Sequence, residues 1–111
     1  MSAWKTLESP TLKVPLELRE TTGPGSPDRI WEVQELRTGC VFKVNLTRSV
    51  LEGESEPAMR ARRGLREAEI ERAVCLAVEE ALLSEPEKEP GVTYEVSVGS
   101  QEVETAVGLS S

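Results

Sequence analysis

The sequence predicts an α+β fold with two layers: a mostly antiparallel sheet of four or five strands, in the order β-β-β-α-β, covered on one face by one main helix. Three observations support this. Several short segments alternate apolar with polar residues, which is typical of half-buried strands. One segment, residues 65–84, repeats apolar residues at helical spacing. A chain of 111 residues suits one hydrophobic core and is too short for two ordinary domains.

The expected organisation is an N-terminal arm at residues 1–11, a single domain at residues 12–107 and a frayed tail at residues 108–111. The arm is mostly polar and lacks a long apolar pattern. Trp4 is its one large aromatic residue. We expect Trp4 to pack on the sheet of the same chain or, as the alternative, on a protein partner.

The first predicted strand covers residues 12–19, where alternate positions are apolar: Leu12, Val14, Leu16 and Leu18. Pro15 cannot donate a ladder hydrogen bond, so we expect this strand at an edge of the sheet or with a bulge at the proline. Residues 21–28 are rich in glycine and proline and predict a loop.

Two apolar-rich runs between Ile30 and Val50 flank the sequence Arg37-Thr-Gly-Cys40 and predict a hairpin. A two-residue turn at Thr38 and Gly39 fixes the facing pairs on the apolar side: Trp31 with Leu46, Val33 with Val44, and Glu35 with Phe42. Glu35 is expected at the end of its strand near solvent, rather than as an acid with a tuned pKa. The other face is polar, so a cover is needed on one side only.

Residues 65–84 are predicted to form the covering helix, with an apolar stripe of Ile70, Val74, Ala77, Val78, Ala81 and Leu82. Cys75, Leu76 and Leu83 widen the stripe beyond what one sheet face requires. Pro86 ends the helix. The segment Ser55 to Pro57 resembles a helix start, and Gly64 predicts a break or a bend.

The last predicted strand covers residues 92–98, where Val92, Tyr94, Val96 and Val98 alternate with polar residues. Beyond Gly99, the alternation continues at Val103, Thr105 and Val107. This pattern predicts an optional final strand that extends a hairpin.

The charge balance is acidic, with 20 acidic and 13 basic residues and a net charge of −7. Such a charge opposes non-specific binding to nucleic acid and to anionic membranes. No signal peptide and no long apolar stretch occur in the sequence, so we expect a cytoplasmic protein that does not bind membranes. Cys40 and Cys75 form no Cys-x-x-Cys pair and are expected to be buried thiols, with a disulfide as the alternative.

The sequence lacks the residue types that most often carry catalysis and metal binding. It contains no histidine, and Asp28 is its single aspartate. Without histidine, Cys40 has no obvious base to activate it as a nucleophile. The glutamates of residues 67–80 mostly have the spacing of a solvated helix face. We therefore expect no enzyme, no cofactor and no metal site, with catalysis through glutamate or arginine as the minor alternative.

The sharpest local feature is a cluster of arginines before the predicted helix: Arg60, Arg62, Arg63 and Arg66. Guanidinium groups beside a helix N-terminus suit a phosphate or a carboxylate. Glutamates at positions 52, 54, 56, 67 and 69 surround the cluster and are close enough in sequence to neutralise it. We expect a self-paired surface, with anion binding as the alternative.

These observations favour a non-enzymatic protein-interaction or structural module that acts through its surface. The expected partner is another protein or, as the alternative, a second copy of the chain in a homo-oligomer, which would associate at a sheet edge or at the helix stripe widened by Leu76 and Leu83. The alternative function is a nucleic-acid or anion-binding module that uses the arginines from Arg60 to Arg66.

Overall fold

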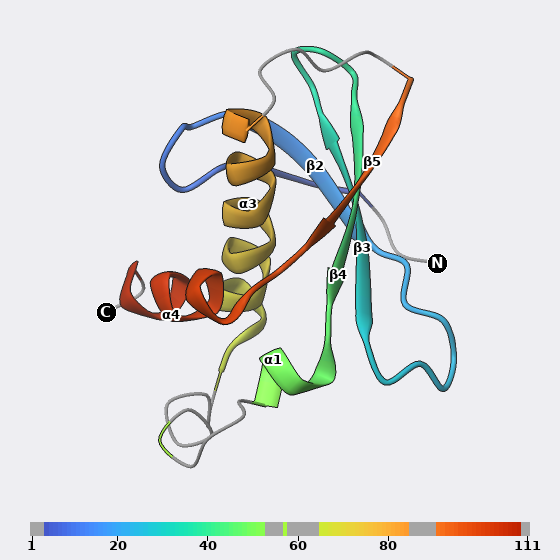
Figure 1. Ribbon diagram of the computed structural model, residues 1–111. Helices are drawn as coiled ribbons and strands as arrows, with labels where there is room; N and C mark the ends of the chain where they lie inside the picture. The colour runs from blue at the N-terminus through green and yellow to red at the C-terminus, as the bar shows by residue number, and fades with distance from the viewer. Residues whose placement is uncertain (1–3, 53–56, 58–64, 85–90, 110–111) are drawn as a thin grey trace.

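The protein forms a five-stranded sheet in which the strands lie in chain order (Figure 1). The computed structural model describes residues 4–52, 57, 65–84 and 91–109. The strands are β1 (Lys5–Glu8), β2 (Pro15–Glu20), β3 (Arg29–Glu35), β4 (Val41–Leu46) and β5 (Thr93–Ser97). The first four strands are antiparallel neighbours, and β5 runs parallel to β4.

The helices lie on one side of this sheet (Figure 1). They are α1 (Arg48–Glu52), α3 (Glu67–Ser84) and α4 (Ser100–Leu109). Two parallel neighbouring strands need a long crossover connection, and α3 lies in the connection from β4 to β5. The parallel pair thus brings α3 back over the sheet. The two-layer α+β fold with one main helix, predicted from the sequence, is confirmed.

The core lies between α3 and the facing side of the sheet. The sheet contributes alternate residues of three strands, all almost completely buried: Leu16, Leu18, Trp31, Val33, Phe42, Val44 and Leu46. The helices contribute a matching set: Ile70, Ala73, Val74, Ala77, Val78, Val103 and Ala106. Each large apolar side chain buried in this way stabilises the fold by about 1.5–3 kcal/mol.

The hairpin between β3 and β4 has a different register from the predicted one. Trp31 pairs with Val44 and Val33 pairs with Phe42, so the expected pairs were wrong by two positions. The loop holds four residues, 36–39, and closes when the N–H of Gly39 donates to the carbonyl of Glu35 at 2.8 Å. A slip of two residues keeps each side chain on its face, so the predicted faces are correct.

Glu35 explains the longer loop. Its carboxylate is fully buried and accepts the backbone N–H groups of Arg37 at 2.9 Å and Thr38 at 2.8 Å, as well as the Thr38 hydroxyl at 2.6 Å. The Arg37 Nε lies 3.0 Å from the same carboxylate. The expectation that Glu35 lies near solvent was therefore wrong, because the loop folds back over it. Burial raises the pKa of Glu35, but the hydrogen bonds outweigh burial and hold the pKa below its ordinary value.

A strand lies within the predicted N-terminal arm. β1 pairs Lys5 with Leu18 and Glu8 with Pro15, so β2 is an inner strand and the predicted edge position was wrong. Pro15 is tolerated there because it is the first residue of β2. The four residues of β1 are too few to show an apolar alternation.

The chain after Gly99 is helical, so the predicted final strand at Val103, Thr105 and Val107 was wrong. Positions 103 and 107 also have helical spacing, and Val103 packs into the core. The Glu102 carboxylate accepts the Gly99 N–H at 3.0 Å and caps the first turn of α4. Gly108 and Leu109 belong to this helix.

The predicted main helix is confirmed at Glu67–Ser84. It begins where the Arg66 carbonyl accepts the N–H groups of Glu69 and Ile70, both at 3.1 Å. The expected helix start at Ser55 and the bend at Gly64 lie outside the described residues.

Replacing Glu35 with alanine leaves the N–H groups of Arg37 and Thr38 without their acceptor. We expect the free energy of unfolding to fall by about 2–3 kcal/mol, measured by urea denaturation at neutral pH. The matched control is Glu8→Ala, which removes an exposed carboxylate and should change stability by less than about 0.5 kcal/mol.

The loss of stability caused by Glu35→Ala should also depend on pH. The pKa of Glu35 is lowered on folding, so the ionised carboxylate stabilises the fold at pH values above its ordinary pKa of 4.5. This stabilisation is lost as the pH falls through the folded-state pKa. The difference between wild type and Glu35→Ala should therefore shrink in acid. A difference that stays constant with pH would contradict the role of the ionised carboxylate.

Candidate functional site

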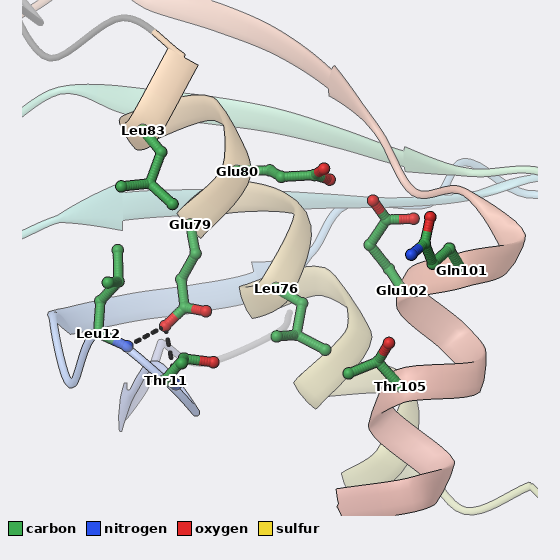
Figure 2. Close-up of a pocket in the computed structure, with 9 residues that line it drawn as sticks. All are labelled: Thr11, Leu12, Leu76, Glu79, Glu80, Leu83, Gln101, Glu102 and Thr105. Atoms are coloured by element: carbon green, nitrogen blue, oxygen red, sulfur yellow. Dashed lines mark hydrogen bonds between the residues drawn. The ribbon is translucent and has the colours of Figure 1, made fainter.

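An open groove of about 210 Å³ lies between α3, α4 and the loop from β1 to β2 (Figure 2). It is lined by Thr11, Leu12, Leu76, Glu79, Glu80, Leu83, Gln101, Glu102 and Thr105. We call it the α3–α4 groove. It combines exposed leucines with acidic side chains.

The apolar part of the groove consists of three leucines. Leu83 is 68% exposed, Leu12 is 41% exposed and Leu76 is half-buried. Leu76 and Leu83 are the residues that widen the predicted helix stripe, and α4 covers only part of this wider stripe. The sequence therefore pointed to the α3 side of the groove. It gave no sign that Leu12 and α4 complete it.

The groove wall formed by the β1–β2 loop is fixed by Glu79. This side chain is almost completely buried, and its Oε2 atom accepts the N–H of Thr11 at 2.9 Å and of Leu12 at 2.6 Å (Figure 2). The sequence placed Glu79 on the solvated face of the helix, which was wrong. The loop supplies backbone donors that satisfy the buried carboxylate.

The rim of the groove carries two carboxylates that point toward each other, Glu80 from α3 and Glu102 from α4 (Figure 2). The pKa of Glu80 is raised first by a hydrogen bond to Glu102, which requires a protonated carboxyl group, and then by the negative charge of Glu102, which repels an ionised Glu80. Neither lysine nor arginine is among the residues that line the groove. The rim is thus an acidic site in which a cationic group would relieve the repulsion between like charges.

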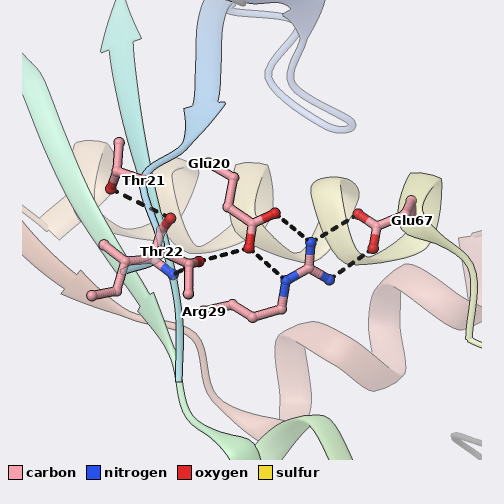
Figure 3. Close-up of polar contacts among 6 residues, drawn as sticks. Glu20, Thr21, Thr22, Arg29 and Glu67 are labelled. Atoms are coloured by element: carbon pink, nitrogen blue, oxygen red, sulfur yellow. Dashed lines mark hydrogen bonds and ion pairs between the residues drawn. The ribbon is translucent and has the colours of Figure 1, made fainter. Parts of the chain in front are cut away.

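A second charged cluster ties α3 to the sheet (Figure 3). The Arg29 guanidinium lies 2.7 Å from a Glu20 oxygen and 2.8 Å from a Glu67 oxygen, and it covers the ring of Trp31 at 4.7 Å. The Arg29 hydrogen bond lowers the pKa of Glu20 despite partial burial. Arg29 pairs with both glutamates, so each charge in this cluster has a partner. The cluster is therefore structural.

The predicted site residues lie in different parts of the molecule. Arg66 is exposed directly before α3, whereas Arg60, Arg62 and Arg63 lie outside the described residues. Trp4 is 38% exposed and packs on its own chain, where the Arg19 guanidinium covers its ring at 4.5 Å. Trp4 therefore lies on the sheet face opposite α3. The structure does not bring Trp4 and Arg66 into one site.

The two cysteines, Cys40 and Cys75, are free and buried, so the alternative of a disulfide was wrong. Burial raises the pKa of the Cys75 thiol to about 12, which keeps it protonated and unreactive. Within the described ranges, no group of cysteine and acidic side chains has the arrangement of a metal site. No helix in those ranges is both long enough and apolar enough to cross a membrane.

Replacing Glu79 with alanine removes the acceptor for the N–H groups of Thr11 and Leu12. We expect a loss of about 1–3 kcal/mol in the free energy of unfolding, and faster hydrogen exchange at these two amides. Glu104→Ala, an exposed change on α4, is the matched control. Unchanged exchange at Thr11 and Leu12 would show that Glu79 does not hold the loop.

Replacing Glu80 with glutamine should stabilise the protein at neutral pH, because it removes the repulsion with Glu102. The raised pKa of Glu80 means that its protonated form favours folding, and that this benefit is lost as the pH rises through the folded-state pKa. The gain should therefore grow with pH and vanish in acid. It should be small, since the site is exposed to solvent. Urea denaturation across the pH range measures it, and a loss of stability at neutral pH would contradict it.

No family model, no curated protein and no solved structure matches the chain. The geometry and the charges of the groove therefore carry the functional proposal.

Proposed function

We propose that the protein is a non-enzymatic interaction module that binds a protein partner in the α3–α4 groove. The partner segment presents an apolar side chain next to a lysine or an arginine. The observation that carries this proposal is the pairing of exposed leucines with the acidic rim of Glu80 and Glu102.

The apolar contact sets the strength of binding. A volume of about 210 Å³ accommodates one or two side chains of a partner. Burying one leucine-sized side chain contributes about 1.5–3 kcal/mol, which alone gives a weak complex. The groove is therefore suited to a short segment that binds reversibly.

The electrostatic contact selects the type of partner. A cationic side chain between Glu80 and Glu102 pairs with both carboxylates and removes their mutual repulsion. The net charge of −7 attracts basic segments over a longer range and raises their rate of association. An acidic segment with the same apolar residues is repelled by these charges and associates more slowly.

The expected location of this module is the cytoplasm. Free, buried Cys40 and Cys75 are consistent with a reducing compartment. The alternative function, nucleic-acid or anion binding through Arg60 to Arg66, stays a prediction, because Arg66 is the one member of this cluster that the structure describes.

The test uses two synthetic helical peptides that differ only in charge, one of leucine and lysine and the other of leucine and glutamate. In amide NMR titrations, the basic peptide should shift the signals of Leu76, Leu83 and Thr105 in a saturable manner. The acidic peptide should bind at least about tenfold more weakly. Equal binding of both peptides would contradict the proposed selectivity, and shifts away from the groove would contradict the site.

A charge-reversal pair separates the groove from the general acidity of the chain. Glu80→Lys should weaken binding of the basic peptide at least about fivefold, because it places a cation at the rim. Glu104→Lys makes the same change in net charge on the exposed side of α4 and should leave binding nearly unchanged. Equal losses in the two variants would show that binding depends on net charge alone.

A further inference from the structure

The sheet has a second face, on the side away from the helices, and no described helix covers it (Figure 1). We propose that this open face binds the same face of a second copy of the chain. The inference is independent of the α3–α4 groove, because it depends on residues of the opposite layer.

The main observation is a row of alternating charges across the open face. Cross-strand pairing aligns four residues, one on each of the strands β2 to β5: Arg19, Glu32, Lys43 and Glu95. Their charges are positive, negative, positive and negative. The Nη2 atom of Arg19 lies 3.4 Å from the Oε2 atom of Glu32, and Lys43 and Glu95 are exposed. The Trp4 ring covers the Arg19 end of the row.

Such a row is complementary to a reversed copy of itself. When a twofold axis runs along the strands between two open faces, the order of strands in the second copy is reversed. Arg19 then faces Glu95 of the second copy, and Glu32 faces Lys43 of the second copy. Each of the four charges meets an opposite charge.

The neighbouring rows agree with this arrangement. One row aligns Glu17, Gln34, Val41 and Thr93, so its single charge faces a threonine of the second copy. The row with Ile30, Asn45 and Ser97 carries no charge. A twofold axis perpendicular to the strands that passes through the charged row would instead place Arg19 against Arg19 and Glu32 against Glu32. The charges therefore select one orientation.

The geometry is that of two aligned sheets packed face to face, about 10 Å apart and about 30° from parallel. Long charged side chains span this gap more readily than short ones. The face is mostly polar, so the dimer should be weak and sensitive to salt.

The first experiment measures the molar mass of the full chain by sedimentation equilibrium, between about 10 μM and 1 mM protein. At an ionic strength of about 0.05 M we expect a reversible dimer, and at about 0.5 M at least tenfold weaker association. A monomer over the whole concentration range at low salt would overturn the proposal.

The second experiment uses two complementary charge reversals. In Lys43→Glu, residues 32 and 43 are both negative, and in Glu32→Lys they are both positive, so each variant alone should be monomeric. In a mixture, positions 32 and 43 of the two variants again pair opposite charges. The mixture should therefore form heterodimers with nearly the affinity of the wild type. This recovery also shows that both variants are folded.

Arg66→Glu is the matched control, since it changes the net charge as Lys43→Glu does but lies before α3. It should leave the dimer within about threefold of wild-type affinity, because exposed charges outside the interface contribute little. Two outcomes would overturn the proposal: dimers of the single variants as strong as those of the wild type, or a mixture that stays monomeric.

Discussion

The structure depends on the need to cover one apolar face of a small twisted sheet. Seven large apolar or aromatic side chains of β2, β3 and β4 point to this face and are almost completely buried, so the sheet is not stable without a second layer. The parallel pairing of β5 with β4 satisfies this need, because it places α3 in the crossover connection. Arg29 then fixes the first turn of α3 to the sheet through Glu20 and Glu67. The groove and the open face are consequences of this single-sided cover.

The sequence predicted those features that depend on periodicity. The strand faces and α3 follow from spacings of two and of three to four residues, and a register slip of two residues leaves the faces unchanged. Features that depend on a few local polar contacts were missed. The hairpin loop is set by the buried carboxylate of Glu35, and the first turn of α4 is capped by Glu102. Neither contact has a distinct sequence pattern, and the valines near position 105 fit a strand as well as a helix.

The candidate site was predictable only in part, for a related reason. Leu76 and Leu83 exceed what the sheet requires, so the sequence indicated an extra contact surface on α3. The rest of the groove comes from segments distant in the sequence, the β1–β2 loop and α4. The position of the loop on α3 depends on Glu79, whose buried carboxylate accepts two backbone N–H groups of that loop. A helical glutamate gives no sequence signal of this kind, since most glutamates at such positions are solvated.

The two proposed surfaces use charge in different ways, and this difference is the reason why we propose different partners for them. In the α3–α4 groove, Glu80 and Glu102 repel each other, so the free protein carries an unfavourable interaction that a cationic partner removes. A second copy, which is acidic itself, is a poor occupant of that site. Along the row of Arg19, Glu32, Lys43 and Glu95 on the open face, positive and negative charges already alternate, so this row has no net charge for a foreign ligand to neutralise. What distinguishes a partner there is the order of the charges, and the reversed order in a second copy matches it.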